Sequence, residues 1–231
     1  TVLSISALQH VEEGGIKEWA RKILSFTDNR QDASLQAGHF NDFVQVSILR
    51  AAILIALERY GQLRFDNAAQ NVVECIGLSL SGVAKNKDLR EDTTQGREVW
   101  NTFRDLVEYR LFEDLRRGWR VVQPNLEQCG LLFIEYRGLE ELCKEDKNWD
   151  GLPSFKILSP ETRKEILTPV LDHFRKKLAI STGCLKEQYQ QQLRKRALEQ
   201  INERWSFDES EKPRPASRFL LPGEPTRPIE G

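Results

Sequence analysis

The 231-residue sequence has no methionine, four cysteines and three histidines. The cysteines are far apart, no pair has CxxC spacing and no histidine stands near one at zinc-finger spacing. A structural metal site or a disulfide framework is therefore not predicted, and free thiols in a reducing cytoplasm are the expected state. The first residue is threonine, and a natural reading frame starts with methionine. The sequence thus predicts a piece of a longer protein or a processed product.

Long hydrophobic runs and an excess of one charge are also missing. The longest apolar stretch, residues 51–57, is too short to cross a bilayer, and no secretory leader opens the chain. We therefore expect a cytoplasmic protein without a membrane partner. The 34 Lys and Arg residues balance 35 Asp and Glu residues, for a formal net charge of −1. Dedicated nucleic-acid binders usually carry a basic excess, so this balance counts against strong DNA binding by the chain alone.

Signals for catalysis are sparse. The sequence contains no GxxxxGK[ST] phosphate loop and no acidic DExH strand, which are the parts that hold ATP and Mg²⁺ in many motor proteins. His39 and Asp42 share a helix face, but no nucleophile completes an acid–base set, so a structural role is favoured. The sequence therefore predicts no catalytic residue, no metal site and no cofactor in this chain.

Helical periodicity dominates what is present, and the predicted fold class is mainly α. Helices are expected over about 31–60, 68–78, 94–117, 139–145, 159–180 and 184–206, the last with a thin apolar stripe that places it on the surface. The apolar face of the helix at 31–60 covers nearly the whole circumference at 51–57, so this helix is expected to be central and buried, with a break or kink near Gly38. Residues 131–136 predict a strand. Five of the nine prolines follow residue 212, so residues 207–231 are expected to be a linker or wrapping tail.

A strand, a turn and a helix start are predicted before the first long helix. The apolar run at 22–26 predicts a buried strand, and the polar residues after it predict a tight turn. A helix N-terminus beside such a turn attracts anions, because its free N–H groups and dipole point the same way. Arg30 adds a planar cation suited to phosphate. Taken alone, these residues favour a structural role, in which Asp28 caps the helix and Arg30 forms a surface ion pair. The same stretch resembles motif IV of superfamily 2 helicases, and that resemblance implies instead that Thr27, Asp28, Arg30 and Gln31 contact a nucleic-acid backbone or a nucleotide cleft.

Residues 23–35 resemble motif IV of superfamily 2 helicases, and the longer string FTDNRQDASLQAGHFNDF is similar to large bacterial DEAD/DEAH-type helicases. Some of those helicases sit in phage-defence gene clusters. Weaker likeness continues through residues 126–132 and near Arg163. In such proteins, motif IV starts the second RecA-like motor domain, and a helical insertion follows it. The resemblance implies a parent chain that uses ATP and Mg²⁺ to move along a nucleic acid, with DNA favoured over RNA.

The resemblance also implies a division of the chain. Residues 1–60 would be the start of the second RecA-like domain, and residues 61–206 would be the helical insertion. Within that insertion, the helix, turn, short helix and strand at about 94–145 resemble a winged-helix element. Three residues beside the expected wing are candidate DNA contacts, because an aromatic ring among guanidinium groups can stack on a base. They are Arg117, Trp119 and Arg120.

A second function remains open. The near-neutral charge and the thin-striped helix at 184–206 are also typical of a helical protein–protein scaffold that binds no nucleic acid. The basic clusters at residues 116–120, 175–177 and 194–196 all have acidic residues close by, and such clusters are usually solvated helix faces. That interpretation is favoured for the cluster at 116–120 as well. Salt-dependent DNA binding distinguishes the two functions, since each phosphate contact contributes to the salt slope.

Overall fold

The computed structural model describes residues 30–117, 124–208, 211–217, 219–220 and 228–229, with side chains from residue 43 to 116 and from 124 onward to 217 apart from 209–210. This part of the chain is mainly helical, as predicted. In chain order its elements are α2 (Arg30–Tyr60), α3 (Ala68–Ile76), α4 (Leu80–Val83), α5 (Thr94–Arg117), α6 (Leu139–Lys144), η2 (Asp146–Trp149), α7 (Pro153–Lys156), α8 (Pro160–Lys176), η3 (Gly183–Leu185), α9 (Glu187–Gln200), β1 (Phe219–Leu220) and β2 (Pro228–Ile229).

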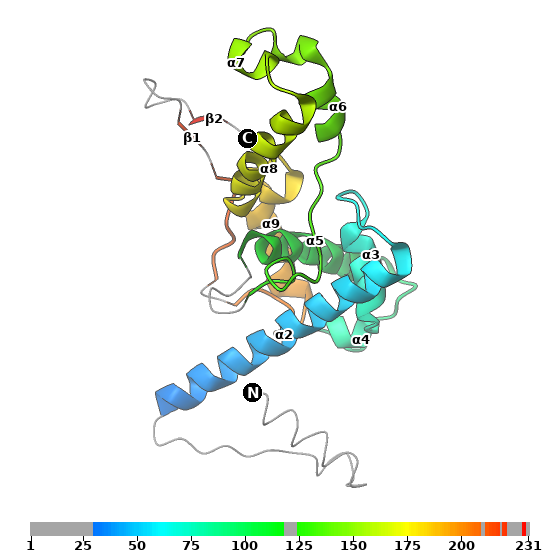
Figure 1. Cartoon of the computed structure of the whole chain (residues 1–231). Helices are drawn as coiled ribbons and strands as arrows, with labels where there is room; N and C mark the ends of the chain where they lie inside the picture. The colour runs from blue at the N-terminus through cyan, green and yellow to red at the C-terminus, as the bar shows by residue number, and fades with distance from the viewer. Residues whose placement is uncertain (1–29, 118–123, 209–210, 218, 221–227, 230–231) are drawn as a thin grey trace, which may run out of the picture.

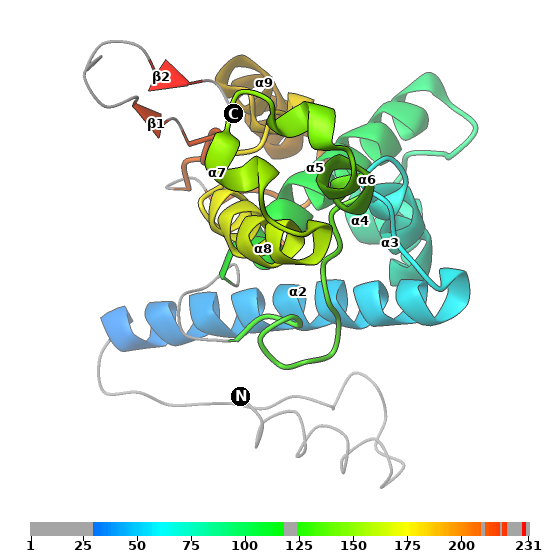
Figure 2. The ribbon, with the colours of Figure 1, turned by 45° about the horizontal axis from the view of Figure 1, so that its top comes forward.

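Helix α5 is the centre of the helical body, with α3, α4, α8 and α9 packed against it (Figure 2). The predicted apolar spacing holds, because Val99, Phe103 and Leu106 are buried on one side of the helix. Phe103 meets Trp205 edge to face, with ring centroids 5.4 Å apart. Burial of such aromatic side chains supplies much of the core's stability.

Helix α2 is one uninterrupted helix that extends past the body (Figure 1). The predicted break near Gly38 is absent. It ends where expected, since Gly61 adopts a left-handed conformation and its N–H bonds to Leu57 O at 2.8 Å. The prediction of burial all round was wrong, because Ile55 is 44% exposed while Leu49 and Ile53 face the core. The apolar residues on the outer face of α2 therefore do not belong to this core.

Residues 139–176 form a smaller helical unit around one arginine. Ser159 caps α8 as predicted, accepting a bond from Thr162 N at 3.2 Å. Arg163, in the first turns of α8, is 1% exposed and lies 5.6 Å from the centre of the Trp149 ring. Its guanidinium group reaches back to the chain segments around α6 and α7, so it connects residues that are otherwise distant in sequence.

The winged-helix element predicted at about 94–145 is not supported, since no strand occurs among the described residues of that range. Residues 131–136, predicted as a strand, form neither a strand nor a helix. A strand needs a partner to bond to, and none lies beside these residues in the described structure. The strand predicted at 22–26 lies outside the described residues, and the division of the chain at residue 60 stays a prediction.

Helix α9 lies at the surface, as expected, with one thin stripe facing inward. That stripe, Leu193 and Ala197 with Gln190, is buried against α5, and the opposite face of the helix is exposed. The start of the tail covers the stripe further, since Gln190 Nε2 donates to Arg214 O at 2.6 Å. Tyr109 OH accepts a bond from Arg214 N at 2.9 Å. Residues 211–217 thus lie against the helical body.

Candidate functional site at the junction of α2, α5 and α8

The residues predicted as functional fall at the edges of the described structure. Arg30 and Gln31 are the first two residues of α2, and Arg117 is the last residue of α5, with side chains outside the described part. Thr27, Asp28, Trp119 and Arg120 lie wholly outside the described residues. What the structure does describe is how the chain is held on both sides of residues 116–123.

The first clamp comes from Arg50 on α2. Its guanidinium group binds the Asp114 carboxylate on α5 through Nη2 at 2.8 Å and through Nε at 3.1 Å. Its Nη1 donates to Pro124 O at 2.9 Å. The Asp114 side chain is 1% exposed, so this two-pronged bond lies away from water and holds its geometry tightly.

Asn125, which follows residues 118–123 in the chain, contributes further hydrogen bonds to the same junction. Its Nδ2 donates to Asp114 O at 2.9 Å, and its side-chain oxygen accepts a bond from Gln128 N at 2.8 Å. Gln128 in turn accepts from Asn125 N. These reciprocal bonds make a rigid turn at residues 125–130, ending at Gly130 in a left-handed conformation.

The second clamp comes from Arg175 on α8. Its Nη1 donates to Leu115 O at 2.8 Å, and its Nη2 donates to Glu127 Oε1 at 2.7 Å. Asp172 accepts both from Arg175 and from Tyr136 OH, the latter at 2.6 Å. Arg175 therefore joins α8 to the end of α5 and to the turn at residues 125–130.

The pKa values around Arg175 reflect this network. Partial burial acts to raise the pKa of Asp172, but the hydrogen bonds from Tyr136 and Arg175 outweigh it and lower that pKa. Burial and the bond to Asp172 raise the pKa of Tyr136 to about 12. Burial acts to lower the pKa of Arg175, while its bonds to Glu127, Tyr136 and Asp172 raise it above the ordinary value. Asp172 and Arg175 are therefore both charged at neutral pH, as their ion pair requires.

Together the two clamps bind residues on both sides of 118–123, which lie outside the described structure. Asp114 and Leu115 precede those residues, and Pro124 and Glu127 follow them. One arginine, Arg50, contacts both flanks from α2, and the other, Arg175, contacts both flanks from α8. The residues that flank the candidate DNA contacts are thus joined to two different helices.

The other two basic clusters are mixed. Arg175 is buried, so the expectation of a solvated face was wrong for this residue. Arg194 Nε donates to Glu211 O at 3.0 Å, and Arg196, which is partly exposed, pairs with Asp105 at 3.1 Å. The lysines of both clusters are exposed, as expected. Sequence reasoning also missed Arg50 and Asp114 as a pair. In the sequence, the only indication of this ion pair was that each residue is a charged residue on an otherwise apolar helix face.

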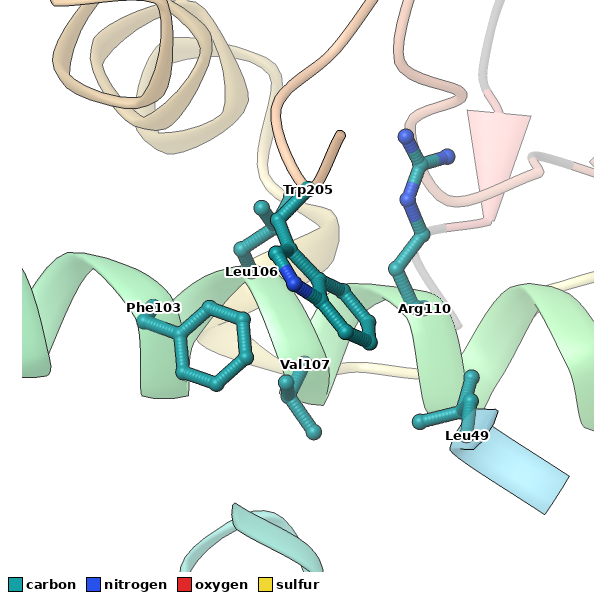
Figure 3. Close-up of a pocket in the computed structure, with 6 residues that line it drawn as sticks. All are labelled: Leu49, Phe103, Leu106, Val107, Arg110 and Trp205. Carbon is teal, nitrogen blue, oxygen red and sulfur yellow. The ribbon is translucent and has the colours of Figure 1, made fainter. Parts of the chain in front are cut away.

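Cavities in the described structure do not suggest a small-molecule site. One, of about 10 Å³, lies in the core between α2, α5 and residue 205 and has room for no more than a water molecule (Figure 3). Its lining residues are Leu49, Phe103, Leu106, Val107, Arg110 and Trp205. Another, of about 260 Å³, is an open polar depression lined in part by Asn86, Gln95 and Glu199. No group of potential metal ligands occurs among the described residues.

Comparisons with known proteins returned no family model, no curated protein and no solved structure that matches this chain. In the part of the chain that the structure describes, no helix has the length and apolar character needed to span a membrane. The function is therefore argued from the sequence pattern and the geometry of the junction.

Proposed function

We propose that this chain belongs to an ATP-dependent nucleic-acid helicase or translocase, to which it contributes the motif IV region and an accessory helical insertion. The proposal rests first on the string at residues 22–43. The structural observation that supports it is α2, which begins at Arg30, directly after the residues predicted to form the polar turn of that motif, and continues without a break into the helical body. A motif at the start of a motor domain would thereby be connected to the insertion by a single helix.

Helix α2 is suited to transmit movement. Its 31 residues span about 46 Å at the usual rise per residue. Its second half is fixed to the body by core residues such as Leu49 and Ile53 and by the Arg50 clamp. A displacement of the motif IV segment during ATP turnover would therefore be passed to the body and to residues 116–123.

ATP and Mg²⁺ would be bound by other parts of the parent chain, so this chain alone is expected to hydrolyse no ATP. Its own task would be contact with the nucleic acid, with DNA favoured over RNA. The proposed contacts are those predicted from the sequence: Thr27, Asp28, Arg30 and Gln31 near the start of α2, and Arg117, Trp119 and Arg120 in the clamped segment.

Salt-dependent DNA binding tests this function. We expect the chain to bind a fluorescent single-stranded oligonucleotide with an affinity that falls as salt rises, because Lys and Arg displace counterions from phosphates. Changing Arg30, Arg117 and Arg120 to Ala should flatten the plot of log affinity against log salt by about one unit for each phosphate that no longer has a bound cation. Fluorescence anisotropy over a salt series measures both quantities.

A matched control is Lys87→Ala, which removes an exposed cation from the loop before α5, away from the junction. It should leave the affinity and the slope as in the wild type. If the triple variant also binds like the wild type, or if the wild type shows no binding at low salt, the nucleic-acid function is wrong.

The alternative function, a helical scaffold that binds protein and no nucleic acid, has its own support. Several arginines of the basic clusters point into ion pairs, and large apolar side chains are exposed on the described surface, among them Phe65, Phe133 and Ile157. Absence of salt-dependent DNA binding in the experiment above would favour this scaffold function.

A further inference from the structure

Residues 131–136 have the surface pattern of a β-strand without its sheet. Leu131, Phe133 and Glu135 are exposed, and the three residues that alternate with them are half-buried. Phe133 is 79% exposed and Leu131 is 56% exposed. A period of two is typical of a strand with one face on a core and one face in water. Figure 1 shows the segment as an extended trace between the end of α5 and α6.

Most backbone N–H and C=O groups of this segment form no hydrogen bond in the described structure. Leu131 N donates to Leu126 O, and Tyr136 O accepts from Leu139 N. Between them, no N–H or C=O group of residues 132–135 has a hydrogen-bond partner in the described structure. An exposed strand edge of this kind is a template for pairing with another extended chain.

The segment is also held in place by its inner side. Leu132 packs against the core, and Tyr136 is fixed by its bonds to Asp172 and Arg175. Because the conformation is already set, a strand that adds to this edge would have little ordering to impose on it. Such preorganisation favours binding.

The charged residues on the exposed face of this segment indicate which side chains a strand that pairs with it would have. Glu135 and Arg137 are both exposed, and neither forms an ion pair in the described structure. Opposite charges placed directly across two antiparallel strands attract, and like charges repel. A strand that fits this edge therefore has a basic residue opposite Glu135, an acidic residue opposite Arg137 and apolar residues opposite Phe133 and Leu131.

We propose that residues 131–136 are a docking edge for one extended segment of a partner protein, which adds as an antiparallel strand with this charge pattern. Main-chain bonds would supply affinity, and the alternate side chains would supply selectivity. A second copy of the chain does not fit. The register that places Glu135 opposite Arg137 in two antiparallel copies would also place Phe133 opposite Leu139, the first residue of α6.

The test uses two peptides of identical composition. The first, acetyl-Glu-Thr-Lys-Thr-Val-Thr-Val-amide, has the required pattern when it lies antiparallel to residues 131–137. The second has the Glu and Lys exchanged. We expect the first to shift the backbone amide signals of residues 132–135 saturably in NMR spectra of the full ¹⁵N-labelled chain. The second should bind at least about fivefold more weakly, since cross-strand pairs contribute up to about 1 kcal/mol each.

A charge-exchanged variant controls for the peptides themselves. Glu135→Lys combined with Arg137→Glu alters two exposed side chains only, so the fold should persist and the preference between the two peptides should reverse. The proposal is overturned if neither peptide binds, if both bind the wild type equally, or if the shifts fall on α8 and not on residues 132–135. Dimerisation of the free chain that buries residues 132–135 would also overturn it.

Discussion

Arg163→Met is expected to lower the free energy of unfolding by about 3–5 kcal/mol, because it removes a buried cation together with the hydrogen bonds that it donates. Arg163 is 1% exposed. It donates to Cys143 O at 2.8 Å, Phe155 O at 2.9 Å and Lys156 O at 2.6 Å. These carbonyl groups belong to chain segments around α6 and α7, so the guanidinium group joins both segments to α8. Chemical denaturation of the wild type and the variant measures the difference.

Two further variants separate the bonds of Arg163 from its charge. Arg163→Lys keeps the charge but not the planar fork, so most of the loss should remain. Lys164→Met, at the next position, removes a cation that is 52% exposed and should change the stability by less than about 1 kcal/mol. If Arg163→Met proves as mild as Lys164→Met, then Arg163 does not organise residues 139–176.

Asp114→Asn is expected to destabilise the chain by about 2–4 kcal/mol, since it takes the carboxylate away from Arg50 at a buried position. The introduced amide still offers one oxygen to Arg50, but its NH2 group replaces the second oxygen and faces the guanidinium group, and the bond to Pro124 O remains. The combined change Arg50→Met with Asp114→Leu should be much less harmful, because two apolar side chains of similar size can replace a buried ion pair.

A double-mutant cycle on Arg50 and Asp114, measured by urea denaturation, gives their coupling energy. We expect a coupling of about 2 kcal/mol or more in favour of the pair. Additive effects of the two single changes would mean that the clamp between α2 and α5 contributes nothing specific to the junction.

The helices were predictable because their signal is local. Apolar spacing located α5 at 94–117, and the Ser159 cap located the start of α8. The clamps were not predictable, because Arg50 and Asp114 are 64 positions apart and Arg175 reaches Leu115 across 60. A sequence marks a charged residue on an apolar face, but the identity of its partner depends on how the helices pack.

The strand predicted at residues 131–136 shows what a local pattern leaves undecided. These residues do alternate between exposed and half-buried, but no partner strand lies beside them in the described structure, so no strand forms. The thin stripe on α9 was predicted correctly, and so was the exposure of the opposite face of that helix. The elements that bury the stripe, α5 and residues 211–217, could not be identified from the sequence, because they depend on tertiary packing.

The central claim of our proposal is that the clamps from α2 and α8, which bind the residues on both sides of 118–123, prepare that segment to contact a nucleic acid. The most direct test measures DNA affinity and its salt slope for Arg50→Met combined with Asp114→Leu, which keeps the core filled but frees Pro124 from α2. We predict an affinity about five- to thirtyfold weaker, because the segment must then be ordered on binding, with the slope unchanged since every phosphate keeps its cation. Wild-type affinity in this folded variant would contradict the claim.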